Sequence, residues 1–475
     1  MKNIITKLSL LLLILFSLSC GLENNETDIV ILYTNDEHGW LEPNDEYDGA
    51  PGLSGLWKSK EGYNGSDSYL ILSGGDMWTG PAISTWFKGE SMVEVMNEMG
   101  YDAVAIGNHE FDFTVDVLNQ RLQQMDFPLL SANIIEKKTG NIPSFAQPYI
   151  IIESNGVNVG IIGLSSLSTP YSTFPAYVED YEFTSYSEAV DKYATTAKDE
   201  GAEVIIIIGH ICDNEMEALV PTAKAHGIPL ITGGHCHQIV ARESDGVLLI
   251  EAGSNMRYYA KIELQYDKKT KSVKINSYSI ENNQEGCSDN KVQSIVESWQ
   301  ARVKEALSDV IGYCSENIEK SSVEMGNMVT DSWFYTFPDA DISITNSGGI
   351  RQDIIAGEIS LETIVGLLPF NNTILELDLT GTELINCIGY YLLGGMTTIN
   401  GYFLSDGTPI YDDSVYSVLT TDYLYSVSSN NFSQYDPDPV NTSVHYRQPL
   451  IDWIISKNTS TQNPLNNYLD YTPRR

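Results

Sequence analysis

The sequence is poor in positive charge. It holds 27 lysine and arginine residues against 64 aspartate and glutamate residues, which gives a formal net charge of −37 at pH 7. Because such a surface repels phosphate backbones, polymeric nucleic acid is not expected as a natural partner. Any site for a small anion must therefore create its own local positive potential.

Cysteine is also scarce, with six residues in a chain of 475. They form no cysteine-rich metal pattern, and five remain once Cys20, near the N-terminus, is set aside: Cys212, Cys236, Cys287, Cys314 and Cys387. Five is an odd number, so no complete disulfide framework can be inferred from the sequence. The chain also shows no internal repeat, no long low-complexity segment and no clear pairing of a serine or cysteine nucleophile with a base.

What the sequence does contain is five short polar motifs, each just after an apolar run. The runs occupy 29–33, 69–72, 103–106, 204–208 and 229–232, and the motifs are TNDEHG, SGGDMW, GNHEFD, IIGHICD and TGGHCH. Short continuous apolar runs are typical of strands that are buried on both faces of a sheet. Since open α/β sheets place their sites at the carboxyl ends of strands, we expect the motifs to converge in space.

The residue types in these motifs predict a site for two metal ions. They are Asp36, His38, Asp76, Asn108, His109, Asp112, His210, His235 and His237. Imidazole suits zinc, iron, cobalt or nickel, while carboxylate and amide oxygens also accept manganese or magnesium. Two ions about 3.5–4 Å apart need an anionic ligand between them, and Asp76, alone on its loop, can fill that role. The intervening Glu37 and Cys236 are expected to point elsewhere.

These motifs resemble those of the metallophosphoesterase superfamily and, within it, of the bacterial 5′-nucleotidase family. The resemblance covers nearly the whole chain after its first residues. It implies an α/β fold in which an N-terminal αββα sandwich of two mixed sheets flanked by helices precedes a C-terminal α+β substrate-binding domain. It also implies two divalent metal ions, which could be zinc, manganese, cobalt, iron or magnesium.

The same resemblance assigns roles to single residues. One metal would be held by Asp36, His38, Asp76 and His237, and the other by Asp76, Asn108, His210 and His235. His109 would not be a ligand but would stabilise the phosphate or the leaving group, and Asp112 would orient it. Phosphate esters would then be hydrolysed by a hydroxide that the two metals activate.

A second group of motifs, past residue 320, resembles the family's substrate-binding domain. In NSGGIR and LLPF, Asn346 and Arg351 would contact the base or ribose and the phosphate, and Phe370 would stack on the base. Tyr423 is expected to be the second stacking residue. The segment after it reads YSVSSNNF and lacks the family's GGDG, which leaves Asn430 as the nearest candidate for the ribose contact. Upstream of GN, where the family often carries an arginine, Lys320 is the only cation.

Length and pattern predict two domains. We expect a catalytic domain over 29–285, a linker helix over 286–310 and a substrate-binding domain over 311–475. Apolar residues at helical spacing mark the linker helix: Val292, Ile295, Val296, Trp299, Val303, Ala306 and Leu307. The alternating segments 258–267 and 272–280 predict a hairpin just upstream.

The first 20 residues resemble a bacterial lipoprotein signal. Lys2 and Lys7 precede the apolar run 8–18, which is too short to span a membrane, and Cys20 follows. We expect removal of 1–20, a tether over 21–28 and a lipid on Cys20 as the only link to a membrane. Because Ser17 occupies a position where leucine is preferred, ordinary secretion stays an alternative. Export predicts a periplasmic or cell-surface location.

Three interpretations of function follow. The leading one is an exported 5′-nucleotidase that hydrolyses nucleoside monophosphates to nucleoside and phosphate. The second keeps the metal centre but acts on 2′,3′-cyclic nucleotides, UDP-sugars or another phosphoester, because the segment after Tyr423 is altered. The third is a surface binding protein that retains the fold.

Overall fold

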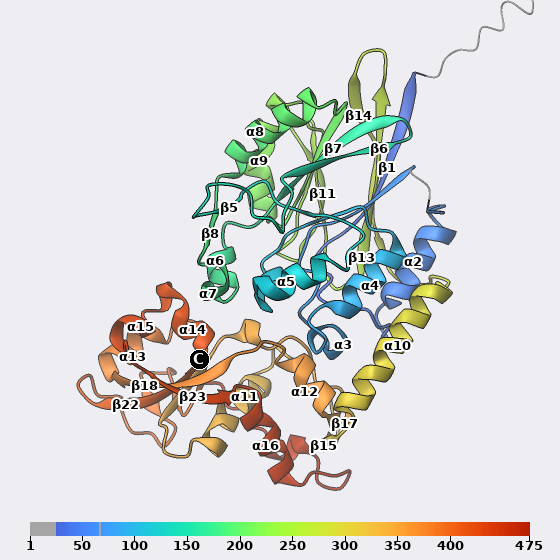
Figure 1. Cartoon of the computed structure of the whole chain (residues 1–475). Helices are drawn as coiled ribbons and strands as arrows, with labels where there is room; N and C mark the ends of the chain where they lie inside the picture. The colour runs from blue at the N-terminus through green and yellow to red at the C-terminus, as the bar shows by residue number, and fades with distance from the viewer. Residues whose placement is uncertain (1–24, 66–67) are drawn as a thin grey trace, which may run out of the picture.

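The computed structural model describes residues 25–65 and 68–475 (Figure 1). The predicted signal and Cys20 lie outside the described residues. Within them the chain forms two parts, an N-terminal part drawn in blue to green and a C-terminal part drawn in orange to red. No helix in the described part of the chain is long and apolar enough to span a lipid bilayer.

Two six-stranded mixed sheets form the centre of the N-terminal part. The first has the order β14-β13-β1-β2-β3-β4, with β1 to β4 parallel and β13 antiparallel to β1. The second has the order β11-β12-β10-β9-β7-β6, with β12, β10, β9 and β7 parallel. The first sheet's strands are β1 (Glu26–Thr34), β2 (Tyr69–Ser73), β3 (Ala103–Ala105), β4 (Leu129–Leu130), β13 (Tyr258–Asp267) and β14 (Ser272–Asn282). The second sheet's strands are β6 (Tyr149–Ser154), β7 (Val157–Leu164), β9 (Val204–Gly209), β10 (Leu230–Thr232), β11 (Ile239–Ser244) and β12 (Val247–Ala252).

Helices cover the outer face of each sheet. Against the first sheet pack α2 (Gly49–Ser59), α4 (Glu90–Met99) and α10 (Asn290–Leu307), and against the second pack α8 (Tyr186–Asp199) and α9 (Asp213–Ala225). Along β9, Ile206 faces the core between the sheets while Ile205 and Ile207 face the helices. Burial on both faces explains why the strands read as continuous apolar runs, and it confirms the predicted α/β fold of two mixed sheets flanked by helices.

Two predictions can be compared with the observed elements directly. The predicted hairpin is present as β13 and β14, which pair antiparallel. Strand β1 already begins at Glu26, which pairs with Asp267, so the last residues of the predicted tether are part of the sheet. Antiparallel pairing with β13 draws these polar residues into the strand, although they lack the apolar pattern by which we placed its start at residue 29.

The C-terminal part is built on a five-stranded sheet of order β19-β16-β22-β18-β23. The strands are β16 (Ile342–Thr345), β18 (Thr373–Thr380), β19 (Leu392–Gly394), β22 (Val415–Thr421) and β23 (Val440–His445). Its alternating side chains pack into two cores, so that Val418 and Leu419 face opposite sides. On the side of Leu419 lie α11 (Val323–Thr336), α12 (Leu361–Leu367) and α16 (Gln448–Lys457), and on the other α13 (Gly381–Cys387), α14 (Asp422–Ser426) and α15 (Phe432–Tyr435).

Helix α10, yellow in Figure 1, runs along the side of the molecule from the first part toward the second. It falls inside the predicted range 286–310 and buries Val292, Val296 and Trp299 against α2 and α4. It also contacts α12 of the C-terminal part. The helix thus fixes the two parts beside one another, whereas the domain limits that we drew around it stay a prediction.

Smaller elements complete the chain. Three two-stranded pairs join β5 (Ile134–Glu136) to β8 (Tyr181–Phe183), β15 (Val310–Cys314) to β17 (Gly357–Ser360) and β20 (Met396–Thr397) to β21 (Phe403–Leu404). Among the short helices, α3 (Ala82–Thr85), α5 (Thr114–Leu122), α6 (Thr169–Ser172) and α7 (Pro175–Val178) lie in the N-terminal part. Helices α6 and α7 lie on the side of the N-terminal part that faces the C-terminal part (Figure 1), and α7 contacts α14.

Candidate metal centre and substrate pocket

The loops that follow five parallel strands bring the polar motifs together. Asp36 follows β1, Asp76 follows β2, Asn108 follows β3, His210 follows β9, and His235 and His237 follow β10. Parallel strands end at the same edge of a sheet, and the two sheets present these edges side by side. The structure thereby places all seven predicted ligands in one cluster.

Three groups of side chains within this cluster could each hold an ion. They are Asp36 with His38 and His237, His38 with Asp76 and His109, and Asp76 with His210 and His235, and in each group the ligand atoms lie within 4.8 Å of one another. Asp76 and His38 each belong to two groups, and the role of Asp76 as the bridging ligand stays a prediction. The Oδ2 atom of Asp76 is 3.0 Å from Nε2 of His210, and the Oδ1 atom of Asn108 is 3.2 Å from the same nitrogen.

The donor set fits divalent cations. Nε2 of His38 lies 3.1 Å from Nε2 of His237, and Nδ1 of His235 lies 3.1 Å from Nε2 of His210. Ring nitrogens so close together direct lone pairs at each other unless a proton or a cation lies between them. Mixed imidazole, carboxylate and amide donors suit zinc, manganese, iron or cobalt.

The backbone of the cluster is strained. Five of the seven predicted ligands have a positive φ, namely Asp36 (51°), His38 (47°), Asp76 (58°), His235 (73°) and His237 (55°). This left-handed conformation is uncommon for residues other than glycine. It costs conformational free energy, and residues that adopt it cluster at functional sites. It points successive ligands of each short loop into the same small volume.

Buried carboxylates support the ligand loops from behind. Glu110 accepts hydrogen bonds from the backbone N–H groups of Asp76, Met77 and Gly107, at 2.6–3.0 Å. Glu37 turns away from the cluster, as expected, and accepts hydrogen bonds from Thr34 and Ser73. Burial raises the pKa of Glu37 to about 8, although these hydroxyl groups oppose the shift. We had given Glu110 no role, because its position inside NHEF does not reveal that it faces backbone rather than metal.

His109 is oriented by a carboxylate. Its Nδ1 lies 2.6 Å from Oδ2 of Asp112, and the hydroxyl of Thr173 donates to the other oxygen of Asp112 at 3.1 Å. Burial alone would lower the pKa of His109, but the carboxylates of Asp112 and Asp76 outweigh it and raise that pKa. The two carboxylates thus favour the protonated form of this imidazole, which lies in the wall of the pocket.

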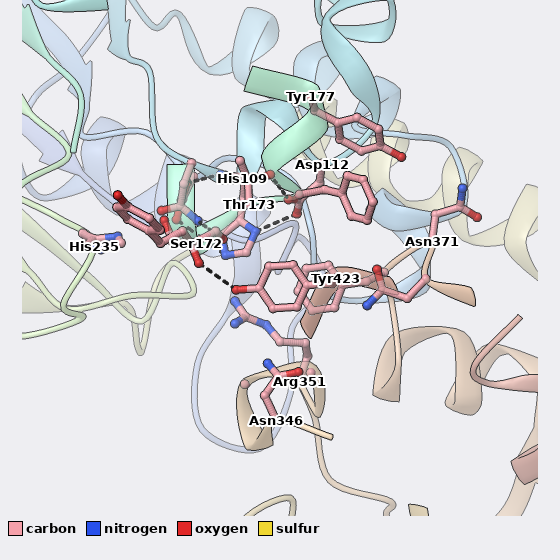
Figure 2. A pocket seen from close by; sticks show the side chains of 18 of the residues that line it. His109, Asp112, Ser172, Thr173, Tyr177, His235, Asn346, Arg351, Asn371 and Tyr423 are labelled. Carbon is pink, nitrogen blue, oxygen red and sulfur yellow. Dashed lines mark hydrogen bonds and ion pairs between the residues drawn. The ribbon is translucent and has the colours of Figure 1, made fainter. Parts of the chain in front are cut away.

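A pocket of about 320 Å³ separates this cluster from the C-terminal part, and both parts line it (Figure 2). All four predicted substrate residues, Asn346, Arg351, Phe370 and Tyr423, are in its wall. The ring of Phe370 stacks on His109 at 5.8 Å between centroids, and Nη2 of Arg351 lies 3.2 Å from Nε2 of His38. The Tyr423 hydroxyl reaches across to donate to the carbonyl of Tyr171 at 2.9 Å (Figure 2).

Two residues that the sequence suggested in place of missing family residues, Asn430 and Lys320, are not among the residues that line the pocket. Asn430 accepts a hydrogen bond from Tyr391 and donates one to the carbonyl of Leu424, so its amide serves the domain core. Lys320 does not line the pocket, and its backbone N–H bonds to Asp353 instead. Neither residue takes the place of the missing family residues.

The pocket also has walls that the sequence did not indicate. They are Tyr171, Ser172, Thr173, Phe174 and Tyr177 around α6 and α7, together with Asn371 and Asn372 after Phe370. The carbonyl of Ser172 accepts from the Asn108 amide at 3.2 Å, and the Ser168 hydroxyl lies 3.0 Å from Nε2 of His235. The asparagines stand next to LLPF and could have been suspected, whereas the segment 168–177 carries no motif.

A second cavity, of about 810 Å³, adjoins the pocket between the two parts. It shares Asp112, Tyr177 and Asn371 with the pocket. Its other walls include the aliphatic and aromatic side chains of Trp86, Phe113 and Ile451 and the cations Lys88 and Arg447. The space beside the metal cluster is thus larger than a single small phosphate ester requires.

One disulfide, which we did not foresee, joins Cys212 to Cys236. Its Cα atoms are 5.3 Å apart, and Cys287, Cys314 and Cys387 are free. Cys236 does lie between two predicted metal ligands, as we inferred. Its partner could not be identified because the two cysteines meet only when β9 and β10 pair.

Comparison with known proteins agrees with this architecture. Residues 303–390 match the family model of the 5′-nucleotidase C-terminal domain. The 5′-nucleotidase of Vibrio cholerae is 27% identical over 416 residues, which cover 75% of this chain and 74% of that protein. Endonuclease YhcR of Bacillus subtilis is 26% identical over 407 residues, but this chain spans only 33% of its length.

Solved structures share the fold. A 5′-nucleotidase precursor from Thermus thermophilus superposes with a TM-score of 0.77 at 20% identity, covering 94% of this chain and 98% of that one. The sulfate thiohydrolase SoxB of the same organism superposes with a TM-score of 0.71 at 15% identity, covering 91% and 95%. The fold and these similarities relate the chain to phosphoric ester hydrolases. Within that class the similarities point to the 5′-nucleotidase family.

Proposed function

We propose that this protein is an exported, metal-dependent 5′-nucleotidase that hydrolyses nucleoside monophosphates to nucleoside and phosphate. One observation carries the proposal. The histidine and aspartate cluster of the first part faces Arg351, Phe370 and Tyr423 of the second part across a single pocket of about 320 Å³. A phosphate and an aromatic base, joined by a ribose, need such a pairing of a cationic site with aromatic walls.

In this proposal the seven clustered residues hold two divalent ions. Asp36, His38, Asp76 and His237 would bind one, and Asp76, Asn108, His210 and His235 the other. When bound, such ions neutralise phosphate charge and lower the pKa of a water enough to supply a nucleophile near neutral pH.

The protein's own residues supply the remaining steps. Asp112 occupies Nδ1 of His109, so Nε2–H is left to donate to the ester oxygen as the bond to phosphorus breaks. Arg351 offers paired donors to the phosphate oxygens and provides the local positive charge that the acidic surface lacks. Phe370 and Tyr423 would hold the base between the two parts.

A related phosphoester is the second candidate, because two observations favour a larger or different leaving group. Asn430, the expected ribose contact, is turned into the core, and the cavity of about 810 Å³ continues the pocket past Asp112 and Asn371. A 2′,3′-cyclic nucleotide would use the same cluster. A UDP-sugar would place its second half in the adjoining cavity.

We propose further that the protein works outside the cytoplasm, anchored by a lipid on Cys20 in the periplasm or at the cell surface. The Cys212–Cys236 disulfide supports export, since disulfides persist in oxidising compartments.

Phosphate release from a panel of esters tests the proposed activity. Purified protein lacking residues 1–20 would be assayed on AMP, UMP, 3′-AMP, 2′,3′-cyclic AMP, UDP-glucose and p-nitrophenyl phosphate, with and without manganese or zinc. Metal-dependent hydrolysis concentrated on the 5′-monophosphates is expected. Activity centred on the cyclic nucleotide or UDP-glucose would favour the second candidate, and none under any metal would leave a binding role.

A further inference from the structure

The seven proposed ligands are not held equally firmly. Asp36, His38, Asp76, Asn108 and His210 are at most 2% exposed. His235 is only half-buried, and the His237 side chain is 39% exposed. Packing therefore fixes the first five, whereas the two ligands on the loop between β10 and β11 need another constraint.

The backbone of that loop is also strained, as is that of the loop after β1, which carries Asp36 and His38. His235 and His237 both have left-handed backbone, with φ values of 73° and 55°, and Cys236 lies between them. Such conformations persist only where the surroundings impose them. Backbone N–H groups hold both ends of the loop, those of Gly233, Gly234 and His235 by donating to Ile250, Ile211 and Asp36, and that of Gln238 by donating to Glu251. Between them, the N–H group of Cys236 donates to the carbonyl of Gly234 inside the loop itself.

The disulfide attaches this loop to a fixed point. Cys212 is 8% exposed and caps the N-terminus of α9, where its backbone N–H donates to Glu215 at 2.9 Å. It also follows the buried ligand His210 by two residues. Cys236, in contrast, is exposed. Since the middle residue of His-x-His points away from the ligands on either side, its sulfur is free to bond to Cys212.

We propose that the Cys212–Cys236 disulfide is a positioning element that holds His235 and His237 in ligand geometry and so sets how tightly both metal ions are bound. The inference rests on the proposed function, which assigns one of these histidines to each ion. Without the disulfide, each ion keeps its buried ligands and loses one that is preorganised. Residues that orient metal ligands typically contribute about 10- to 100-fold to metal affinity.

Manganese binding, measured by equilibrium dialysis against a competing chelator, tests the proposal without an activity assay. The variants are Cys212→Ser, Cys236→Ser and the double substitution, each in the full exported chain. All three are expected to bind manganese about 10- to 100-fold more weakly than the wild type, and by similar factors, because each removes the same bond. Cys287→Ser is the matched control, since Cys287 is exposed and free.

Reduction of the folded wild type breaks the same disulfide without a substitution that could impair folding. A water-soluble phosphine donates two electrons to the S–S bond and takes its oxygen from water, giving two thiols and a phosphine oxide. Circular dichroism at 25 °C would verify that the fold persists. Reduction should weaken manganese binding as the substitutions do, and reoxidation should restore it.

Three results would count against the disulfide as a positioning element. Unchanged manganese affinity in the reduced, folded protein would overturn it, and so would equal losses in Cys287→Ser. A lower melting temperature with unchanged affinity would show that the bond only stabilises the fold. A wild type that binds no manganese or zinc at all would instead overturn the proposed function, and the inference with it.

Discussion

The two parts of the molecule contribute to one pocket in different ways. The first part supplies groups at the ends of buried strands, and Asp36, Asp76 and His210 are at most 2% exposed. The second part supplies Asn346, Arg351, Phe370 and Tyr423 from loops and short helices, where all four are only partly buried. In the proposed function, reaction chemistry is thus built into the sheet framework, whereas substrate recognition depends on segments that can change with little cost to the core.

Substitution of Asp76, the ligand that both proposed metal ions share, should lower activity more than any substitution in the second part. Asp76→Asn keeps the shape but removes the anionic charge between the two proposed ions, so kcat should fall by about 10³-fold. Initial rates on AMP at saturating metal would measure it, with Phe370→Ala as the comparison. Comparable losses in the two variants would contradict the assignment of Asp76.

Loss of the hydrogen bond between Asp112 and His109 should have the second-largest effect on activity. Asp112→Asn removes the carboxylate that orients the imidazole, and kcat should fall by about 10²-fold, the scale of a lost general acid. Because His109 would protonate the leaving oxygen, the loss should be smaller for p-nitrophenyl phosphate than for AMP. Asp116→Asn, an exposed aspartate one turn on, is the control, and equal losses on both esters would argue against proton donation.

Arg351 tests the contribution of the second part. Arg351→Ala should raise KM for AMP by roughly 30-fold, with a smaller change in kcat, since charge-assisted hydrogen bonds hold the phosphate already in the ground state. Lys320→Ala, which removes a cation outside the pocket, should change neither constant by much. If KM is unchanged in the Arg351 variant, that residue is structural.

The aromatic wall should give the smallest effects. Phe370→Ala should raise KM for AMP by about tenfold through lost stacking, while KM for p-nitrophenyl phosphate changes less. Tyr423→Phe keeps the ring and removes the hydrogen bond to Tyr171, so a change of about threefold or less is expected. If Phe370→Ala affects both esters equally, the ring supports His109 rather than a base.

The features that the sequence predicted best are those whose position is determined by a local pattern of residues. Each apolar run became a buried strand, and the residue after it was thereby placed at the sheet edge, as with Asp76 after β2. The linker helix and the hairpin followed from periodicity in the same way. The residues expected to bind substrate also line the pocket, because they follow β16, α12 and β22, while their roles stay a prediction.

What the sequence could not predict depends on contacts between distant segments. Tyr171 and Thr173 reach the pocket because α7 packs against α5 and α14 and because Thr173 and Tyr171 bond to Asp112 and Tyr423. No residue type in 168–177 indicates these contacts. The pairing of Cys212 with Cys236 follows from the order of strands in the second sheet. Asn430 was misplaced because nearness in sequence to Tyr423 says nothing about the direction of its side chain.

The hydrogen bond from Tyr423 to Tyr171 and the stacking of Phe370 on His109 are direct contacts between the two walls. A substrate whose phosphate binds to the first part and whose base binds to the second would link the two parts. Hydrolysis would break that link at the ester bond, so that the nucleoside would keep only its contacts with Phe370 and Tyr423, whereas the phosphate would stay with the metal cluster and Arg351. In this arrangement hydrolysis ends the binding of the nucleoside by both parts at once, which favours its release.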